Sequence, residues 1–596
     1  MAAVAFLPQH ERSAQPARKI APQLYTPHYA DLSPQGWVQH LARRDFSALL
    51  PTCRSNPIGP GDAYAAALEL ARTYRQNADP RAVFQWNELL DSQLDPTQLP
   101  ALEPMAAMRR LGQWVVSLQL LLHAGAARYL APQVVQQLLQ GIGLETRRLL
   151  DEPAAEATLR LPQLLGVIRV AIAFPEYAEA RSWLARAIAQ LDSTLALLLD
   201  EEGAPLDPAL TPVAQFELLC PVLHALRLLR LGSVVVPASL PQRLVAALAC
   251  IAWSLPDPAA ILQDAAALLD GPGQPWPGEE TLRWIISRGA TGRAPTRASR
   301  RYTLSERCFL RDGWRSATTS SPAPAQHVSI QTGHGLLGLG YHLDQQPVLL
   351  APAGPQDSVR IDGLLPGAQP ASHLLHELGL RSDWLRAQRR HQPQGPLHTR
   401  CVVYMMRQYL LVIDRFQADD DQEHQLSLPL QFGVDWDDSR CQQAASDRAL
   451  VHGPGWVAAM LSPDPALPIS LGHRDGRPRL QAEGRWRHSA VLATVVGPEG
   501  ATLRLRSCEL QRTGQYEERL VIRGQDALGR WTDTCIFRND SRQRVLCPDY
   551  ELYSDLLAER RDASGELVHA VAAGPGDVRW HHALPLRITP HGHLEC

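Results

Sequence analysis

The sequence predicts a multidomain α+β protein in which an all-helical half precedes an all-β half. From about residue 60 to residue 290, apolar residues recur at the i, i+3, i+4 and i+7 positions of amphipathic helices. Beyond about residue 305 they recur at alternate positions, which is the period of a half-buried strand. At 596 residues the chain is also too long for one compact core, so we expect several domains.

The helical half consists of long periodic segments separated by connections rich in Gly and Pro. Thr211, Pro212 and Gly232 are the expected N-cap, first helical position and C-terminal stop of one such helix. Short connections between long helices favour antiparallel hairpins, and wide apolar faces favour a layered toroid or a solenoid over a four-helix bundle. The periodic segments are residues 112–126, 132–151, 177–200, 211–232, 239–255 and 258–270.

The β half consists of short runs of β-forming residues separated by turn residues. Because these runs follow one another without an intervening helix, they predict an antiparallel sandwich of two sheets. A stretch rich in Gly, Pro and Arg separates the two halves. We therefore predict an N-terminal extension (1–60), a helical domain (61–290), a linker (291–305) and a β-sandwich domain (306–596). The runs are HVSIQTG, LLGLGYHL, QPVLLA, SVRIDG, HTRCVVYMM, YLLVIDRF, SLPLQFG, TLRLRSCELQ, ERLVIRG and TDTCIFRN.

Composition and charge exclude several classes of protein. The 58 Lys and Arg against 61 Asp and Glu give a net charge of −3, which offers no bulk attraction for nucleic acid or acidic membranes. No stretch reaches the ~18 uncharged apolar residues of a membrane span, and the start of the chain lacks the features of a signal peptide. The 10 cysteines are scattered, which favours free thiols in a reducing compartment. We expect a cytoplasmic protein and consider a periplasmic location less favoured.

Several segments resemble the heparinase II/III-like family of polysaccharide lyases. Residues 176–207 resemble a late helix of that family's toroid and the turn after it. Residues 309–354 resemble its first sandwich strands, in which a Gly-His turn precedes an alternating strand, and residues 356–363 and 398–415 resemble the strands that follow. The resemblance covers about residues 110–440. It implies an N-terminal (α/α) toroid of helical hairpins followed by a C-terminal antiparallel β-sandwich.

The same resemblance implies β-elimination on a uronic-acid sugar. In that reaction a base removes the proton next to the carboxylate, and an acid protonates the leaving glycosidic oxygen. In the family, tyrosine and histidine usually carry the proton steps, an asparagine or histidine in the toroid binds the carboxylate, and many members hold a structural zinc. The implied setting is bacterial capsule or exopolysaccharide metabolism, and the implied partner is an anionic polysaccharide or oligosaccharide.

This sequence departs from the family pattern at most of those positions. His334 matches the histidine of the Gly-His turn, but Ala351 and Gln356 stand where further zinc ligands are expected. One ligand of three cannot hold the metal, so no zinc is predicted, and no motif for another cofactor is present. Arg160 and Gln163 stand where the family has an asparagine-histidine pair, and the expected toroid tyrosine is missing.

The candidate catalytic residues are His334, Tyr341 and His342. His334 would act from its turn, although a turn histidine bonded to backbone is the commoner state. Tyr341 and His342 are neighbours on a predicted strand and therefore point to opposite faces, which is poor geometry for a catalytic pair.

The candidate substrate-binding residues are Arg160, Gln163, Arg360, Arg381 and Trp384. Arg360 can hold a sugar carboxylate with two nitrogens, although an exposed ion pair with Asp362 is the default interpretation. Arg381 and Trp384 lie in the basic segment 371–391, which we predict to be a loop over a cleft. Its charge suits uronates and its indole suits stacking on a sugar ring, and a merely solvated loop is the alternative.

Two classes of function stay open from the sequence. The first is an active lyase that uses a rearranged site without a metal. The second is a non-catalytic relative that binds an anionic glycan or a protein of the polysaccharide-synthesis machinery. The missing tyrosine and zinc positions favour the second class, whereas the usual activity of the family favours the first.

Overall fold

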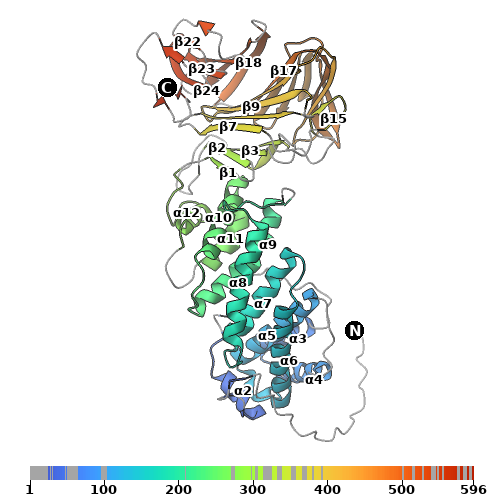
Figure 1. The fold of residues 1–596 in the computed structure, drawn as a ribbon, viewed down its shortest axis with the longest axis vertical. Helices are drawn as coiled ribbons and strands as arrows, with labels where there is room; N and C mark the ends of the chain where they lie inside the picture. The colour runs from blue at the N-terminus through green and yellow to red at the C-terminus, as the bar shows by residue number, and fades with distance from the viewer. Residues whose placement is uncertain are drawn as a thin grey trace. The chain divides into compact units, whose positions relative to one another are not determined.

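The protein, seen in a computed structural model, divides into two compact units (Figure 1). The helical unit is Met1–Asp207, Val213–Leu248 and Ile261–Glu279, and the β unit is Pro208–Pro212, Ala249–Ala260 and Glu280–Cys596. The structure describes residues 25–26, 29, 31–46, 49, 65–94, 104–207, 210–269, 276–296, 299–302, 307–312, 314, 325–331, 338–350, 358–365, 372–378, 382–390, 394–499, 503–512, 517–526, 529–538, 545–546, 550–552, 556–573, 578–580, 587–588 and 594–595.

Helices build the helical unit, and their starts follow local sequence signals (Figure 1). The side chains of Ser33 and Asp79 cap two of them by accepting hydrogen bonds from the backbone amides of Gly36 and Arg81, each at 3.0 Å, and a proline follows each cap. The described helices are α2 (Pro34–Ala42), α3 (Ala65–Asn77), α4 (Pro80–Gln93), α5 (Pro104–His123), α6 (Pro132–Asp151), α7 (Ala157–Ala173), α8 (Ala180–Leu198), α9 (Pro212–Leu231), α10 (Ser239–Ser254), α11 (Pro258–Leu269) and α12 (Glu279–Ile286), with the 3₁₀ turn η2 (Ala126–Tyr129).

All the periodic segments that predicted helices are helical. Pro212 opens α9, and the amide of Gly232 bonds to the carbonyl of Leu228 directly after its end, as the sequence indicates. Among the described residues, helix α2 lies inside the predicted N-terminal extension: it packs against α6, and its Trp37 is 1% exposed. The described part of that extension therefore belongs to the helical core. At the other boundary, α12 ends at Ile286, and the first strand begins at Arg300 inside the predicted linker.

By length and composition alone, α9 is able to cross a membrane. Half of its apolar stretch is buried within the protein, and the core helices of soluble proteins meet the same criterion. No membrane span is therefore evident among the described helices, in agreement with the prediction from the sequence.

The turn after α8 packs directly against α10. A Cβ atom on Gly203 would lie 2.3 Å from the backbone of Ala246 and Ala247, and the φ of Gly203 is +84°. We expect Gly203→Ala to lower the free energy of unfolding by about 1–3 kcal/mol, because overpacking adds to backbone strain. Urea denaturation followed by circular dichroism measures the loss. The matched control is Gly125→Ala, which has a φ of +77° but nothing within 4 Å, and an equal loss in both variants would contradict the steric explanation.

The β unit is antiparallel wherever strand pairs are described. Sheet A is β1 (Arg300–Tyr302), β2 (Arg307–Arg311), β3 (Gln326–Gln331), β4 (Gly338–Leu343) and β5 (Gln346–Leu349), in that order. Sheet B has the order β12-β13-β14-β17-β10-β9-β8-β7. Its strands are β7 (Ser372–Leu378), β8 (Asp383–Arg390), β9 (Leu397–Met405), β10 (Tyr409–Gln417), β12 (Cys441–Ala445), β13 (Arg448–Gly453), β14 (Trp456–Leu461) and β17 (Ser489–Pro498).

Two further sheets and a small one complete the β unit. Sheet C has the order β15-β16-β11-β6, with β6 (Arg360–Ile361), β11 (His424–Gln431), β15 (Ile469–Arg474) and β16 (Arg477–Trp486). Sheet D has the order β18-β19-β20-β23-β24-β27-β26, with β18 (Leu503–Arg512), β19 (Glu517–Asp526), β20 (Gly529–Arg538), β23 (Leu556–Asp562), β24 (Leu567–Ala573), β26 (Arg587–Ile588) and β27 (Leu594–Glu595). The small sheet joins β21 (Val545–Leu546), β22 (Tyr550–Leu552) and β25 (Val578–Trp580).

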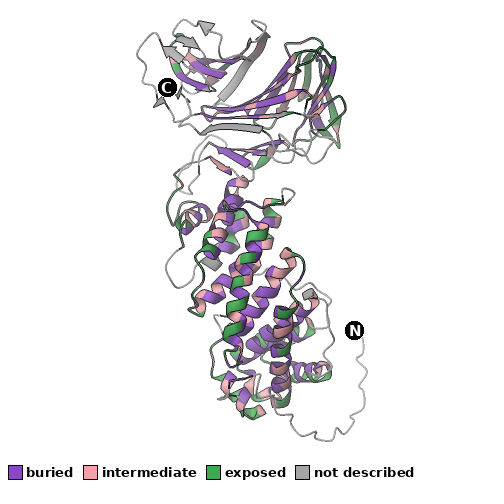
Figure 2. Ribbon diagram, in the orientation of Figure 1, coloured by how far each residue is buried: buried purple, intermediate pink, exposed green. Residues whose placement is uncertain are grey.

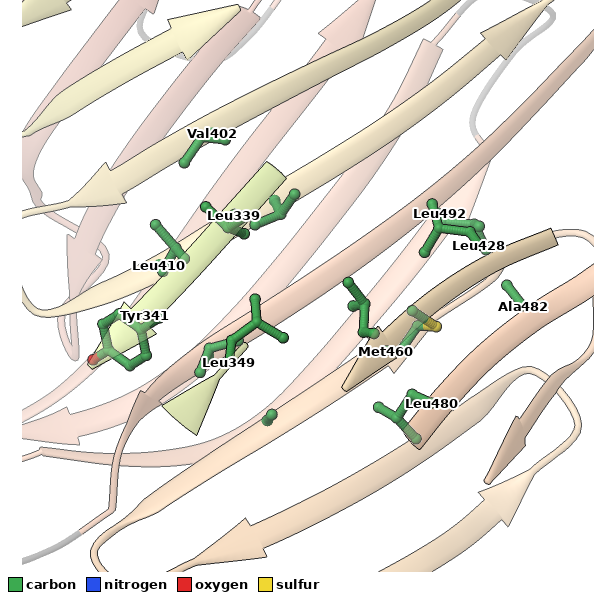
Figure 3. Packing of buried hydrophobic residues seen from close by; sticks show 14 of the residues in the cluster. Leu339, Tyr341, Leu349, Val402, Leu410, Leu428, Met460, Leu480, Ala482 and Leu492 are labelled. Atoms are coloured by element: carbon green, nitrogen blue, oxygen red, sulfur yellow. The ribbon is translucent and has the colours of Figure 1, made fainter. Parts of the chain in front are cut away.

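Sheet B is the middle layer of the β unit. On one face its Val402, Leu410 and Met460 pack with Leu339 of sheet A and Leu480 of sheet C in one core (Figure 3). On the other face its residues pack against sheet D in a second core. This core includes Val403, Leu411 and Val495 of sheet B and Ile522 and Leu556 of sheet D. The strands β10, β14 and β17 of sheet B are accordingly buried along most of their length, whereas the edge strand β12 is largely exposed (Figure 2).

The prediction of a two-sheet sandwich is therefore too simple. All ten runs that predicted strands do form strands. However, sheet B has a buried layer on each side, so the described β unit has three layers. The almost continuous apolar run YLLVIDRF in β10 is the sequence signal for this arrangement, because a strand that is buried on both faces has no polar face to alternate with.

A buried charge cluster fastens sheet B to sheet D. Asp533 accepts two hydrogen bonds from Arg560, each at 2.7 Å, and one from the hydroxyl of Tyr409 at 2.5 Å. The Arg560 guanidinium also lies 4.0 Å from the ring centroid of Trp531. Burial raises the pKa of Asp533, whereas Arg560 opposes this shift. With each charge paired, the cluster positions the two sheets without leaving a charge unpartnered in the core.

Segment 371–391 was predicted to be a loop, and this prediction was wrong. The described residues form strands β7 and β8, which pair with each other at the edge of sheet B. In β8 alternate residues enter different cores: Trp384 faces sheet D, whereas Leu385 and Ala387 face sheets A and C. Arginines lie between these residues and obscure the alternating pattern of a strand. The segment therefore has as few apolar residues as a loop.

Candidate functional site

Sheet A carries two of the three residues that were predicted to be catalytic. Tyr341 and His342 are adjacent on β4 and point to opposite faces, as expected. Tyr341 is fully buried in the core under sheet B, and its hydroxyl donates to Oε1 of Gln326 at 2.8 Å. Burial raises the pKa of the Tyr341 phenol well above its usual value. Tyr341 is therefore a packed, neutral phenol with its hydrogen bond already made.

His342 lies on the other face of sheet A in a row of three basic residues. Arg311 on β2 pairs with His327 on β3, and His327 pairs with His342 on β4. The two imidazole centroids are 5.9 Å apart. Cross-strand neighbours on one face lie close together, so three strands present these side chains as one cluster. We call this row the histidine cluster.

The histidine cluster contacts the C-terminal end of α10. This end of the helix, from Ala249 on, belongs to the β unit. The last carbonyls of a helix have no partner within it and carry a partial negative charge. Arg311 satisfies them, because its guanidinium donates to Ala252 and Pro256 at 3.2 Å each, to Trp253 at 3.3 Å, and also to Leu255. The two terminal nitrogens of Arg311 are thus held by backbone carbonyls, and Arg311 serves to orient the cluster.

Both histidines are neutral at neutral pH. Burial, reinforced by the charge of Arg311, holds the pKa of His327 well below 6.5 and also lowers the pKa of His342. Nε2 of His327 donates to the carbonyl of Trp253 at 2.9 Å, which leaves Nδ1 unprotonated. Among the described residues, the buried Nδ1 atoms of both histidines have no hydrogen-bond partner. A neutral imidazole with an unpartnered nitrogen is chemically a proton acceptor.

Only one of the two histidines is open to a substrate. His327 is 3% exposed and stacks on Phe309, whereas His342 is partly exposed. His342 is therefore the candidate base of the cluster, and His327 and Arg311 position it. Sequence reasoning named His342 but missed His327 and Arg311. Their strands were recognised, but the register that aligns the three side chains cannot be read from one strand at a time.

The remaining predicted site residues lie elsewhere. His334 and Arg381 fall outside the described residues. Arg360 is partly exposed on β6 of sheet C. Asp362, its expected ion-pair partner, instead contacts Nδ1 of His424 at 2.9 Å. Trp384 is 4% exposed in the core between sheets B and D, so the predicted stacking of its indole on a sugar ring does not fit this burial.

Arg160 and Gln163 lie on α7 and bond to the backbone just before that helix. Gln163 is 1% exposed, and its Oε1 accepts a hydrogen bond from the amide of Ala154 at 2.9 Å. Arg160 donates to the carbonyl of Ala154 through Nε and a terminal nitrogen, at 3.1 and 3.0 Å. Together they fix the turn that precedes α7. Nε2 of Gln163 is buried and has no hydrogen-bond partner among the described residues.

The described part of the chain contains no group of three or more His, Cys, Asp or Glu side chains arranged to hold a metal ion. His334 and Ala351, on which the prediction of no zinc depends, lie outside the described residues. The absence of zinc therefore stays a prediction.

Comparisons with known proteins support one fold. No protein-family model and no curated protein matches the chain. A mutant of heparan sulfate lyase HepC from Pedobacter heparinus superposes with a TM-score of 0.64 at 13% identity, over 83% of this chain and 93% of that one. A structure described as the heparinase III BT4657 gene product has a TM-score of 0.63 at 12% identity, over 87% and 93%. A further heparinase III has a TM-score of 0.61 at 12% identity, over 86% and 95%.

The chain has a heparinase III-like fold. At these identities the likeness concerns the fold and not the individual side chains. The fold part of the resemblance seen in the sequence is therefore confirmed.

Proposed function

We propose that this protein is a lyase that acts on an anionic, uronic-acid-containing polysaccharide by β-elimination. The observation that carries the proposal is the superposition on a heparan sulfate lyase along 93% of that lyase's chain. The finer assignment of an (α/α) toroid followed by a β-sandwich belongs to the same proposal.

His342 supplies the base in this proposal. The partly exposed imidazole of His342 removes the proton from the carbon next to the carboxylate, the electron pair forms a C=C bond, and the bond to the glycosidic oxygen breaks. The proton gained by the imidazole is then available for the leaving oxygen. A histidine whose pKa is lowered by burial is already unprotonated at neutral pH, which is the state that the first step requires.

We place the reaction in bacterial capsule or exopolysaccharide metabolism, with no resident metal or cofactor, and in the cytoplasm. The cellular location is supported by the thiols: Cys220, Cys250, Cys308, Cys401, Cys441 and Cys535 are free among the described cysteines. Cell fractionation of the source bacterium tests it.

The direct test is to incubate the full chain with a panel of uronic-acid polymers and follow ultraviolet absorbance. β-Elimination creates a C=C bond conjugated with the carboxylate, which absorbs where the substrate does not. We expect at least one polymer to give a progressive rise and new chain ends, which gel filtration detects as shorter products. A chain that binds none of the polymers and produces no absorbance would overturn the proposal.

A non-catalytic glycan-binding protein, or a partner of the polysaccharide-synthesis machinery, is the second candidate. It is favoured by the structural use of predicted site residues, since Tyr341 bonds to Gln326 and Gln163 bonds to Ala154. The same panel separates the two candidates. Salt-sensitive binding without any rise in absorbance would assign the second function.

A further inference from the structure

Three residues of the β unit that are not glycine have a left-handed backbone close to the histidine cluster. Arg288, just after α12, has a φ of +51°. Asp344 and Gln345, with φ values of +46° and +72°, form the turn between β4 and β5, directly after the strand that carries His342. Side chains disfavour this backbone region, and residues kept there against that preference cluster at functional sites.

One carboxylate connects two of these residues. Oδ2 of Asp257 accepts a hydrogen bond from a terminal nitrogen of Arg288 at 2.8 Å and another from the side-chain amide of Gln345 at 3.1 Å. Its Oδ1 accepts from the backbone amide of Ala259 at 3.3 Å, at the start of α11. Asp257 therefore holds the Arg288 guanidinium and the β4–β5 turn together.

Asp257 lies beside the histidine cluster by two separate routes. It follows Pro256, whose carbonyl accepts a hydrogen bond from Arg311 of the cluster at 3.2 Å. Its second partner, Gln345, comes three residues after His342 on the same hairpin. All of these residues belong to the β unit. The ion pair at Asp257 is therefore at the edge of the cluster that contains the candidate base.

The guanidinium of Arg288 is oriented and accessible at the same time. Its side chain is 57% exposed, whereas that of Asp257 is 21% exposed. Its bond to Asp257 uses one terminal nitrogen, so the N–H groups of Nε and of the other terminal nitrogen are available to a ligand. An exposed ion pair contributes little to stability, which does not account for an arginine at a position where glycine is favoured.

We propose that Arg288 binds a carboxylate of the uronic-acid saccharide whose reacting unit lies at His342. The inference rests on the proposed function and names the residue that recognises the charge of the substrate. A guanidinium presents two parallel N–H groups to a carboxylate. If that carboxylate belongs to the reacting unit, Arg288 also stabilises the negative charge that builds on its oxygens as the proton leaves. Asp257 is the positioning residue that holds the guanidinium.

The test is calorimetric titration of the full chain with an oligouronate from the polymer that it binds, and with the methyl ester of that oligouronate, whose carboxyl groups carry no charge. The His342→Gln background is used so that the saccharide is not cleaved. We expect Arg288→Gln to weaken binding of the oligouronate about 10–100-fold, the size of hydrogen bonds to charged groups. Binding of the ester should change less than about twofold, because the guanidinium has no charge to recognise there.

The matched control is Arg485→Gln. Arg485 is an exposed arginine on β16 of sheet C that also forms an ion pair, with Glu423 at 3.2 Å. Its substitution removes the same charge and should leave both affinities within about twofold of the parent. Equal weakening of the oligouronate and of its ester by Arg288→Gln would show that Arg288 does not recognise the charge, and would overturn the inference.

A second variant separates binding from a structural role. Arg288→Gly places at this left-handed position the residue that adopts it without strain, so the melting temperature should be unchanged or higher. Its affinity for the oligouronate should nevertheless fall as far as that of Arg288→Gln. A stable Arg288→Gly variant with parental affinity would contradict the proposed contact.

The outcomes also separate this inference from the proposed function. If the wild-type chain binds none of the uronic-acid polymers, both fail. If it cleaves a polymer, and Arg288→Gln binds the oligouronate as well as Arg485→Gln does, only the role of Arg288 is overturned.

Discussion

Asp414→Asn is expected to lower the free energy of unfolding of the β unit by about 3–5 kcal/mol, because it removes one partner of a buried ion pair. Asp414 on β10 is 2% exposed, and it accepts hydrogen bonds from Arg400 at 2.7 and 3.0 Å and contacts Nε2 of His398 at 2.7 Å. The asparagine keeps the shape but not the charge. Arg400, which is 4% exposed, then has no anion at this position within the core.

The difference in the free energy of unfolding between wild type and Asp414→Asn is expected to become smaller at acidic pH. Burial alone would raise the pKa of Asp414, but the Arg400 guanidinium and His398 outweigh it and lower the pKa to about 2. A carboxylate with a depressed folded-state pKa stabilises the fold above its unfolded pKa of about 3.9, and this stabilisation is lost as pH falls through the folded pKa. The gap between wild type and Asp414→Asn should therefore be constant above about pH 5 and shrink between about pH 4 and pH 2.

Urea denaturation followed by tryptophan fluorescence, repeated across this pH range, measures both effects. The control is Asp419→Asn, which removes an exposed carboxylate that pairs with Arg390 at 3.1 Å and is itself 79% exposed. An exposed pair contributes at most about 1 kcal/mol, so this variant should remain close to wild type. Equal losses in the two variants would show that burial of the Arg400–Asp414 pair has no special weight.

His342→Gln is expected to lower kcat/KM for the susceptible polymer by about 10²–10⁴-fold, because a positioned general base contributes an effect of that size. Glutamine retains a polar side chain of similar length but cannot accept the proton. The loss should fall mainly on kcat, since the proposed contact is made to the reacting proton. Stability should change little, because Nδ1 has no hydrogen bond to lose among the described residues.

Three measurements make this prediction specific to His342. His473→Gln, an exposed histidine on β15, is the matched control and should retain wild-type activity. Tyr341→Phe, which removes only the hydroxyl bonded to Gln326, should cost about 1 kcal/mol of stability rather than rate. The acid limb of the pH profile should have its midpoint below 6.5, because the pKa of His342 is lowered. A midpoint above 6.5, or full activity in His342→Gln, would assign the base to another residue.

Local patterns in the sequence were sufficient for the secondary structure. Segment 132–151 is α6 from end to end, and Pro212 and Gly232 mark the limits of α9, because capping and helical periodicity act within a few residues. The alternating runs became strands for the same local reason. Other strands were not among the ten predicted runs: β12 to β17, β23 and β24 lie outside them. In segment 371–391, arginines between apolar residues concealed β7 and β8.

The candidate site could not be derived in this way. His342 was identified from its own strand, but its neighbours His327 and Arg311 reach it through the register of three strands. The roles assigned to Tyr341, Trp384 and Gln163 depended on exposure, and exposure is set by the layer that covers each residue.

By itself, the sequence determined the order of the two halves, the helices and strands, and the heparinase-like character of the fold, because these depend on periodicity and on short motifs. Only the tertiary structure decided that sheet B is covered on both faces, and which polar groups remain unpartnered. The reason is that the burial and the electrostatics of His342 arise from residues far apart in the chain. Their effect exists only once the elements are packed together.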